Sequence, residues 1–426
     1  MAILLLLASF GRAWAQPLRT ELQDLVKTNP EILAQQSAVA AASETIDKAY
    51  AGYLPRLDVV GAYGPQYIDS PLTEQSGGSA WVSQAQIVSG RLTQNVFDGF
   101  ATPANVRSAR LNVDVAEATL AGTRQNVLYS GIAAYIEVLR QRELIELARD
   151  SERTIMRQLN LEDERVQRGG GIAVDVLQAK SRLQLAKERR VSFEGGLADA
   201  VARYIQVFGH PPEIDRMTSP PIPRAQIPEA LEEALELARE NNPAIDSSLA
   251  TVDVADERRR LARSDYYPRI DIVTSANREN DNNLVRGTST DMSVMMQATW
   301  NLFNGFATDA GVSQASAEYQ GSLRTHDNVA RQVIQQTRLA WNEMTTAQER
   351  VELLENAVNI ASEVLDARTK LREAGRETVI NVLDAENEVY NARINLVIAR
   401  GDEKRASFQV LQGIGRLELR DLNLNP

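Results

Sequence analysis

The chain has 426 residues, with 46 lysines and arginines against 57 aspartates and glutamates, so its net charge is -11. The charges are spread along the chain without a basic stripe, which argues against a nucleic-acid partner. The sequence contains no cysteine, which excludes disulfides, thiolate metal sites, a cysteine nucleophile and a lipidated N-terminal cysteine. His210 and His326 are the only imidazoles, and neither has neighbours at metal-ligand spacing, so we expect surface histidines, no metal site and no cofactor.

The N-terminal residues have the pattern of a secretory signal peptide. An apolar run from Ile3 to Phe10 precedes Ala13-Trp14-Ala15, with small residues at the two positions that signal peptidase inspects. No positive charge precedes the run, and Arg12 follows it. We predict a signal peptide over residues 1–15 and export from the cytoplasm; the alternative is a buried N-terminal helix.

The rest of the chain is an internal duplication. The motif Tyr-Leu-Pro-Arg-Leu-Asp-Val at 53–59 returns as Tyr-Tyr-Pro-Arg-Ile-Asp-Ile at 266–272. The motif Asn-Val-Phe-Asp-Gly-Phe-Ala-Thr at 95–102 returns as Asn-Leu-Phe-Asn-Gly-Phe-Ala-Thr at 301–308. Each half therefore has the same order of parts: helix, strand, loop, strand, long helix, turn and helix.

The first half predicts three helices. They are an opening helix over about residues 21–51, a long helix over 101–166 and a return helix over 175–206. At 1.5 Å per residue the long helix is about 98 Å long, which the two shorter helices match when stacked end to end. Thr102 and, in the second half, Thr308 are the expected N-caps of the long helices. The apolar stripes are narrow and flanked by charges, which favours helices packed side by side in a thin wall.

Four strands are predicted between the helices, over about residues 56–63, 89–96, 269–276 and 293–301. Polar and apolar residues alternate along them, as in barrel strands with lipid on one side and water on the other. The loops after the first and third strands are rich in Ser, Gly, Asn and Asp, which is typical of hairpin tips. Small closed barrels need about eight strands, and an open edge is not tolerated in hydrocarbon. Several chains must therefore share one barrel.

A proline-rich segment joins the halves and predicts a stiff linker on the outside of the helices. The predicted organisation is a first repeat over residues 16–210, this linker or equatorial strap over 211–228, a second repeat over 229–417 and a C-terminal tail over 418–426.

In this duplicated order, the motifs over about residues 18–417 resemble the outer membrane efflux protein family, the TolC-like outer-membrane channels. The resemblance implies a mixed α/β membrane protein in the outer membrane of a Gram-negative bacterium. It implies a homotrimer with a 12-stranded transmembrane β-barrel, four strands per chain, continued into the periplasm by a long α-helical coiled-coil barrel. The implied partners are a periplasmic adaptor (a membrane fusion protein) and an inner-membrane ABC or RND transporter.

The resemblance also implies a gate at the periplasmic mouth. Asn381 and Asp384 stand where the family usually carries two aspartates, and Asp175 is the first-half counterpart of Asn381. Three-fold repetition would place these carboxylates close together, which favours cations and raises some pKa values. The alternative is that these acids flank helix N-termini, where the helix dipole favours them.

Glycine turns are the remaining candidate sites. The resemblance implies that the turns between the paired helices contact the adaptor, and the plain alternative is that a glycine with positive φ reverses the chain. These turn residues are Arg168, Gly169, Gly170, Ala374, Gly375 and Arg376. The expected junctions between helix and strand are Pro55, Pro268, Gly99 and Gly305.

These expectations together describe an exit duct rather than an enzyme. The duct would passively conduct cargo from an inner-membrane pump and adaptor across the periplasm and outer membrane, in type I protein secretion or small-molecule efflux. The alternative is a periplasmic structural or adaptor protein with helical hairpins and no pore.

Overall fold

The structure is a computed structural model that describes residues 18–71, 80–170 and 172–420. The predicted signal peptide lies outside the described residues, as do most of the first hairpin tip and the end of the C-terminal tail. The chain divides into two compact units. The helical unit comprises residues 1–36, 119–245 and 329–426, and the sheet unit comprises residues 37–118 and 246–328. Both repeats contribute to each unit.

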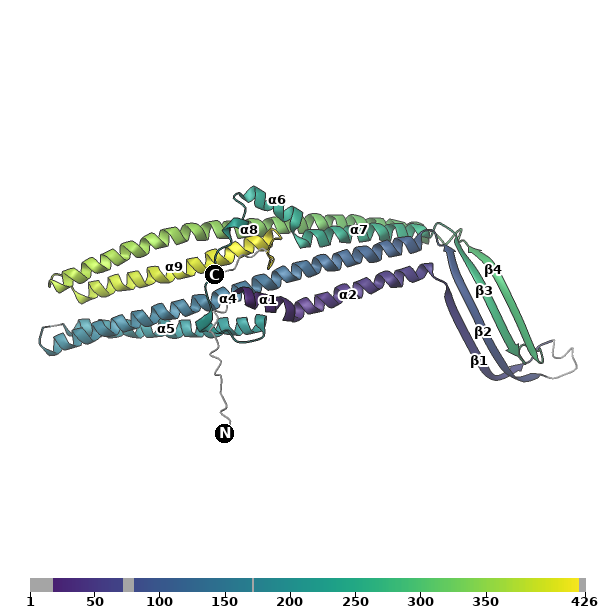
Figure 1. Cartoon of the computed structure of the whole chain (residues 1–426), viewed down its shortest axis with the longest axis horizontal. Helices are drawn as coiled ribbons and strands as arrows, with labels where there is room; N and C mark the ends of the chain where they lie inside the picture. Colours follow the sequence, from purple (N-terminus) through teal and green to yellow (C-terminus); the bar gives the residue numbers. More distant parts are fainter. Residues whose placement is uncertain (1–17, 72–79, 171, 421–426) are drawn as a thin grey trace, which may run out of the picture. The chain divides into compact units, whose positions relative to one another are not determined.

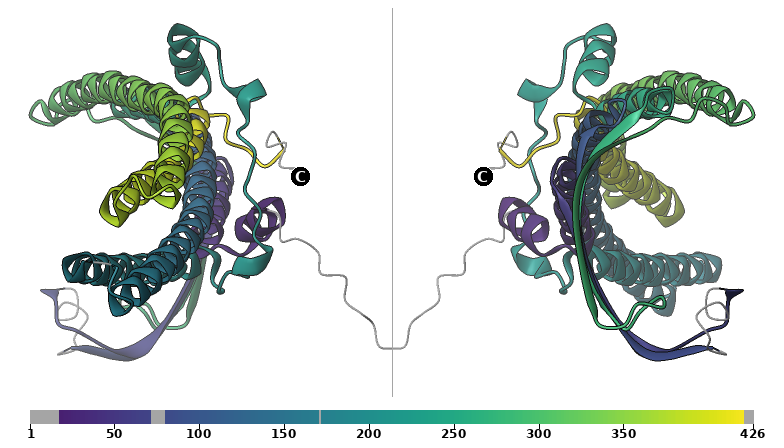
Figure 2. Two further views of the ribbon diagram at one scale, coloured as in Figure 1. Left: turned by 90° about the vertical axis from the view of Figure 1, so that its left-hand side faces the viewer. Right: turned by 90° about the vertical axis from the view of Figure 1, so that its right-hand side faces the viewer.

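The sheet unit contains one antiparallel sheet with strand order β1-β2-β3-β4 (Figure 1). The strands are β1 (Arg56–Ile68), β2 (Trp81–Phe97), β3 (Arg269–Asn280) and β4 (Thr288–Thr299). Leu57 pairs with Leu92, Leu92 with Thr274, and Thr274 with Val294, so one register runs across all four strands. Figure 2 shows that the four strands form a single curved layer.

All four strands extend beyond the predicted ranges at one end. β2 begins at Trp81 rather than near residue 89, because its first half pairs with β1 although Gln84 and Gln86 interrupt the apolar alternation. β4 ends at Thr299, which pairs with Arg269 at the start of β3. The prediction of a strand through residue 301 was therefore wrong, because no described residue of β3 lies beyond that pair.

Four helices begin or end in the sheet unit. They are α2 (Pro30–Tyr50), α7 (Pro243–Ser264), α4 (Ala101–Gln167) and α8 (Ala307–Glu373). The predicted N-caps were wrong. Asp98 accepts hydrogen bonds from the backbone N–H of Thr102, at 2.8 Å, and from its hydroxyl, at 2.5 Å. Thr102 therefore lies within the first turn of α4, and the carboxylate before it satisfies the free N–H.

The helical unit contains α1 (Leu18–Thr28), α5 (Ala173–Phe208), α6 (Leu231–Asn241) and α9 (Val379–Gly413), with most of α4 and α8. The single opening helix that we predicted is two helices, α1 and α2. Asn29 separates them, and its side-chain oxygen accepts a hydrogen bond of 2.9 Å from the backbone N–H of Glu31. Pro30 occupies the first helical position, where its missing N–H costs nothing.

The helices pack through narrow apolar contacts. One buried cluster joins α4, α5 and α9 near their turns, and its members are Leu159, Val176, Ala179, Leu183, Val379 and Leu383. Another joins α8 and α9 and includes Met344 and Val410, with Ile227 of the linker packed against it. None of the described helices carries an apolar stretch sufficient to cross a bilayer.

The linker between α5 and α6 is held to α4 by polar contacts. Tyr135 donates its hydroxyl to the carbonyl of Thr218 at 3.0 Å and accepts the N–H of the same residue at 2.9 Å. Arg142 donates to the carbonyl of Ile214 at 2.7 Å. The linker therefore follows the helix surface, fixed by side chains of α4.

Candidate functional site

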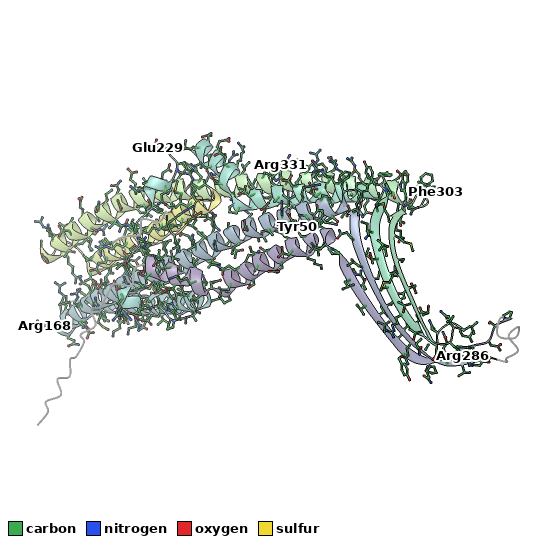
Figure 3. The ribbon with its side chains drawn as sticks, turned by 45° about the vertical axis from the view of Figure 1, so that its right-hand side comes forward. Tyr50, Arg168, Glu229, Arg286, Phe303 and Arg331 are labelled. Atoms are coloured by element: carbon green, nitrogen blue, oxygen red, sulfur yellow. The ribbon has the colours of Figure 1, made fainter. Side chains whose placement is uncertain are left out.

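The two turns that join the paired helices have the same backbone geometry. Gly169 has φ of 80° and Gly375 has φ of 70°. The N–H of Gly170 donates to the carbonyl of Arg165 at 3.0 Å, and the N–H of Arg376 donates to that of Leu371 at 2.9 Å. These bonds make a Schellman motif, in which a left-handed residue ends the helix. Arg168 lies at the end of its hairpin in Figure 3, and both turns expose their flanking side chains.

The predicted gate residues begin the return helices. Asp384 of α9 pairs with Arg182 of α5, with 2.5 Å between carboxylate and guanidinium. The side-chain amide of Asn381 donates a hydrogen bond to the Glu377 carboxylate. The backbone carbonyl of Asn381 accepts a hydrogen bond of 3.2 Å from Arg368. This amide contact lowers the pKa of Glu377. Asp175 lies in the first turn of α5 and is half-buried. The negative charge of Asp384 is therefore matched by a cation from the other hairpin.

A second connection between the hairpins was not predicted. Arg372 of α8 pairs with Glu162 of α4, and both side chains are almost fully buried. Arg372 also donates to Gln158 at 3.2 Å. Burial lowers the pKa of the Arg372 guanidinium, and the neighbouring Glu162 carboxylate opposes that change. The sequence carries no signal for this pair, because the two residues belong to different repeats and meet only through packing.

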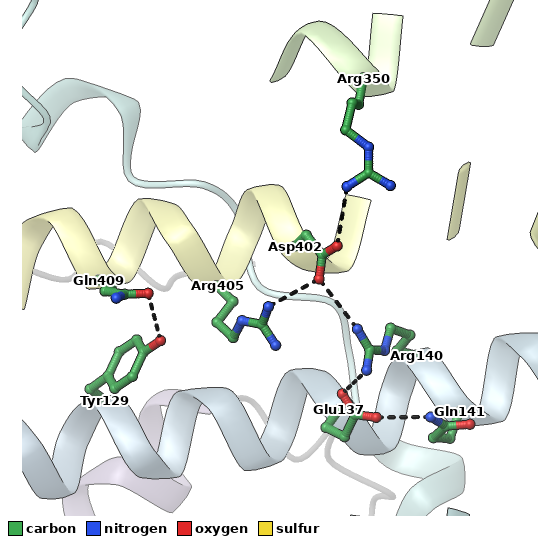
Figure 4. Close-up of polar contacts among 8 residues, drawn as sticks. All are labelled: Tyr129, Glu137, Arg140, Gln141, Arg350, Asp402, Arg405 and Gln409. Carbon is green, nitrogen blue, oxygen red and sulfur yellow. Dashed lines mark hydrogen bonds and ion pairs between the residues drawn. The ribbon is translucent and has the colours of Figure 1, made fainter. Parts of the chain in front are cut away.

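Asp402 of α9 forms ion pairs with arginines from three helices, as Figure 4 shows. Arg140 of α4 lies 3.4 Å from its carboxylate, Arg350 of α8 lies 3.6 Å away, and Arg405 of the same helix lies 3.2 Å away. Arg140 also pairs with Glu137 at 2.5 Å. This cluster ties α4, α8 and α9 together, and sequence reasoning missed it for the same reason.

The sheet has one apolar face and one polar face. Leu57, Val59, Met292, Val294 and Met296 lie on the apolar face, and all five are exposed. On the other face, Ser275 and Ser293 are hydrogen-bonded at 2.8 Å, and Asn277 donates to Asp291 at 3.0 Å. The predicted alternation is clear at these positions, whereas Gln84, Gln86 and Arg278 interrupt the apolar face toward the hairpin tips.

A polar cavity of about 930 Å³ lies where the polar face meets the helices of the sheet unit. Charged residues of both signs line it, including Arg56, Asp58, Arg91, Asp98 and Arg269. Arg56 pairs with Asp58 at 3.0 Å within this lining, and such a charged surface suits water better than an apolar ligand, because an apolar ligand would desolvate the charges.

The strand-to-helix turns are repeated, but only one is packed. Gly99 has φ of 68°, and a Cβ on it would lie 2.4 Å from the carbonyl oxygen of Ser264, so only glycine fits. Gly305 has φ of 67° and nothing within 4 Å of that position. Phe100 contacts the rings of Phe97 and Tyr267, and its counterpart Phe306 contacts that of Phe303, but both phenylalanines are exposed, so the two turns differ in burial at the glycine rather than at the phenylalanine. Phe303 is visible beside this turn in Figure 3.

Pro55 and Pro268 stand directly before β1 and β3. His210 is exposed, as predicted, and His326 is half-buried; each has a polar partner. His210 lies 3.2 Å from the buried carboxylate of Glu21, and His326 is hydrogen-bonded to Ser248 at 2.8 Å. Among the described residues, no group of acidic or histidine side chains is arranged to hold a metal ion.

Comparison with known proteins identifies the family and the relatives that this chain resembles. The outer membrane efflux protein family matches residues 22–210 and 234–416. The outer membrane efflux protein BepC of Brucella suis is 25% identical over 97% of this chain and 88% of its own length. The alkaline protease secretion protein AprF of Pseudomonas aeruginosa is 27% identical over 74% of this chain and 68% of its own length.

Solved structures agree in fold. The CmeC outer membrane channel of Campylobacter jejuni has a TM-score of 0.82 at 14% identity, with 94% of this chain and 87% of that chain covered. The outer membrane protein VceC of Vibrio cholerae has a TM-score of 0.79 at 16% identity, with 93% and 96% covered. The chain therefore belongs to the outer membrane efflux protein family and is an outer-membrane channel protein.

Proposed function

We propose that this protein is the exit duct of a three-part export machine, a conduit through which cargo passes without chemical change. The observation that carries the proposal is the sheet with one exposed apolar face and one polar face. Leu57, Val59 and Met292 are each more than two-thirds exposed, which in water would leave a large apolar patch. Lipid in contact with the apolar face and water in contact with the polar face would solvate each face favourably.

A homotrimer completes the barrel. β1 and β4 are the edges of the described sheet, and an unpaired edge inside a bilayer leaves backbone groups without partners. Pairing β4 of one copy with β1 of the next, three times, closes a barrel of twelve strands. The exposed turn at Gly305 and Phe306 supports this arrangement, because its packed counterpart at Gly99 is covered by the helix end and strand entry of the other repeat.

We propose that the ends of the helical hairpins form the gate. Asp384, Arg182 and the buried Glu162–Arg372 pair connect the first hairpin to the second within one chain. Breaking these ion pairs would free the hairpins to separate. The exposed turns at Gly169 and Gly375 are the surfaces that an adaptor would meet.

The cargo follows from the partner pump. AprF is named for secretion of an alkaline protease and BepC for efflux, which is compatible with either a polypeptide or a small molecule as the cargo of this chain. A deletion strain assayed for exported polypeptides and for drug susceptibility would separate the two. A defect in neither assay would contradict the duct.

Planar-bilayer recording of the detergent-extracted protein tests the channel directly. We expect stable single-channel currents, a trimer in detergent and slower migration after heating. A water-soluble single chain without conductance would instead support a periplasmic structural or adaptor protein.

A further inference from the structure

The polar face of the sheet carries a repeated pair of charges at the ends of β1 and β3 that adjoin the helices. Arg56 lies two residues before Asp58 on β1, and Arg269 lies two residues before Asp271 on β3. Residues two apart on a strand point to the same side of the sheet. Arg56 pairs with Asp58 at 3.0 Å, and Arg269 pairs with Asp271 at 2.8 Å. Each pair is therefore electrically neutral.

Arg91 of β2 adds a positive charge beside the first of these pairs. It lies directly opposite Asp58, so the two side chains share the polar face. The Asp58 carboxylate is already paired with Arg56. Arg91 is exposed and forms no ion pair with any residue that the structure describes. Three arginines and two aspartates on these strands leave one surplus positive charge per chain.

Two further acids line the same cavity, but neither lies on a strand. The Asp98 carboxylate accepts hydrogen bonds from the N–H and the hydroxyl of Thr102, so its charge lies against the positive end of the α4 dipole. Asp265 lies in the turn between α7 and β3. Among the described strand residues that line this cavity, Arg91 is the charge without an ion-pair partner.

The internal repeat shows that strand pairing does not require this charge. In the register that aligns Asn95 with Asn301, the counterpart of Arg91 is Gln297 of β4. Gln297 lies opposite Asp271, as Arg91 lies opposite Asp58. A neutral amide therefore occupies the same place in the second hairpin, with the same pairing on the neighbouring strand.

We propose that Arg91 is a determinant of ion selectivity in the channel, through its surplus positive charge on the polar face of the sheet. This inference rests on the proposed duct, in which water that conducts ions lies against that face. Fixed charges that line a pore attract ions of the opposite sign and repel ions of their own. Arg91 therefore favours anions over cations at this level of the channel.

Neutralisation of Arg91 tests the assignment by bilayer recording in a salt gradient. Arg91→Gln should raise the cation-to-anion permeability ratio by about twofold near 0.1 M salt, where charges act over about 10 Å. The effect should largely disappear near 1 M salt, where that range falls to about 3 Å. Gln297→Arg, which adds a charge at the counterpart position, should shift the ratio in the opposite direction.

Arg278→Gln is the matched control, because it removes the same charge from the other face of the sheet. Arg278 of β3 lies opposite Val88 and is exposed on the apolar face. The net charge of the protein changes by the same amount as in Arg91→Gln. The permeability ratio of this control should match that of the natural protein.

A thiol at position 91 separates the effect of charge from any effect on folding. The natural chain contains no cysteine, so Arg91→Cys can be labelled at that position alone. During recording, a positively charged methanethiosulfonate reagent, which forms a mixed disulfide with the thiol, should restore the natural selectivity. A negatively charged reagent of the same class should raise the preference for cations further. Arg278→Cys should respond to neither reagent.

The outcomes distinguish Arg91 from the duct itself. If Arg91→Gln conducted with the selectivity of the natural protein near 0.1 M salt, Arg91 would have no part in selectivity and the duct would stand. Equal responses of Arg91→Cys to the two reagents would lead to the same conclusion. Absence of conductance in the natural protein would instead overturn the duct, and the role of Arg91 with it.

Discussion

At the residue scale, Glu162 and Arg372 connect the two hairpins through a buried ion pair. Removing one partner of such a pair leaves an uncompensated buried charge, which costs about 3–5 kcal/mol. We therefore expect Glu162→Ala to lower the stability of the helical unit by about that amount, measured by thermal unfolding of the detergent-extracted protein. Glu164→Ala is the control, because Glu164 and Arg168 form an exposed pair worth about 0–1 kcal/mol. Equal effects of the two changes would contradict this account.

Ionisation of Glu386 is expected to lower the stability of the folded chain as pH rises. Burial raises the pKa of its carboxyl, so the folded chain holds this proton more tightly than the unfolded chain. The cost of ionising Glu386 is absent below its unfolded pKa of about 4.3 and grows as pH rises through the folded pKa. We expect Glu386→Gln, which keeps a partner for Gln158, to gain stability relative to the natural protein as pH rises from 4 to 7. A constant difference between the two melting curves would show that Glu386 does not titrate in this way.

At the scale of the element, each helical hairpin turns at a glycine with positive φ, a backbone conformation that is unfavourable for other residues. Gly375 has φ of 70°. A side chain in the left-handed region costs roughly 1–2 kcal/mol. We expect Gly375→Ala to destabilise the α8–α9 turn by about this amount, seen as faster proteolysis at the turn. Gly321→Ala is the opposite case, because Gly321 lies inside α8 with open space around it and alanine favours a helix by about 1 kcal/mol. Similar proteolysis of both variants would contradict the turn assignment.

The same element recurs with different chemistry at the start of the long helices. Asp98 accepts hydrogen bonds from both the backbone N–H and the hydroxyl of Thr102. Its counterpart Asn304 accepts a hydrogen bond of 3.4 Å from the N–H of Thr308 and donates one of 2.8 Å to the Thr308 hydroxyl. Both side chains satisfy the helix end. The repeat therefore preserves the cap while the charge at this junction changes.

At the scale of the whole molecule, the ion selectivity of the channel reports on Asp384 and Arg182. If the pair lies at the mouth, Asp384→Ala leaves Arg182 unmatched in every copy and should shift the reversal potential toward anions. Arg182→Ala should shift it toward cations and increase conductance, because the link between α5 and α9 is lost. Bilayer recording in a salt gradient measures both effects.

Asp327→Ala is the control for the selectivity change, since Asp327 forms an exposed ion pair with Arg324 in the sheet unit. Its reversal potential should match that of the natural protein. If all three variants shared one reversal potential, Asp384 and Arg182 would have no place in the gate.

Much of the architecture was predictable because the strands and helices follow from the local periodicity of apolar residues. Alternation along the strands and heptad steps along the helices are properties of neighbouring residues, and the duplication at Asn95 and Asn301 doubled each signal. Glycines at 169 and 375 marked the helix turns, because positive φ selects that residue type. Boundaries were less certain where a polar residue interrupts the pattern, as Gln84 does in β2.

The sequence by itself therefore determined the kinds of elements, their order and their repetition. Only the tertiary structure decided which charges meet: Arg182 with Asp384, Glu162 with Arg372, and three arginines around Asp402. The physical reason is that ion pairs form between residues far apart in the chain, and their partners depend on the rotation and axial offset of packed helices. Periodicity specifies which face of a helix is buried, but it leaves that offset open until side chains interlock.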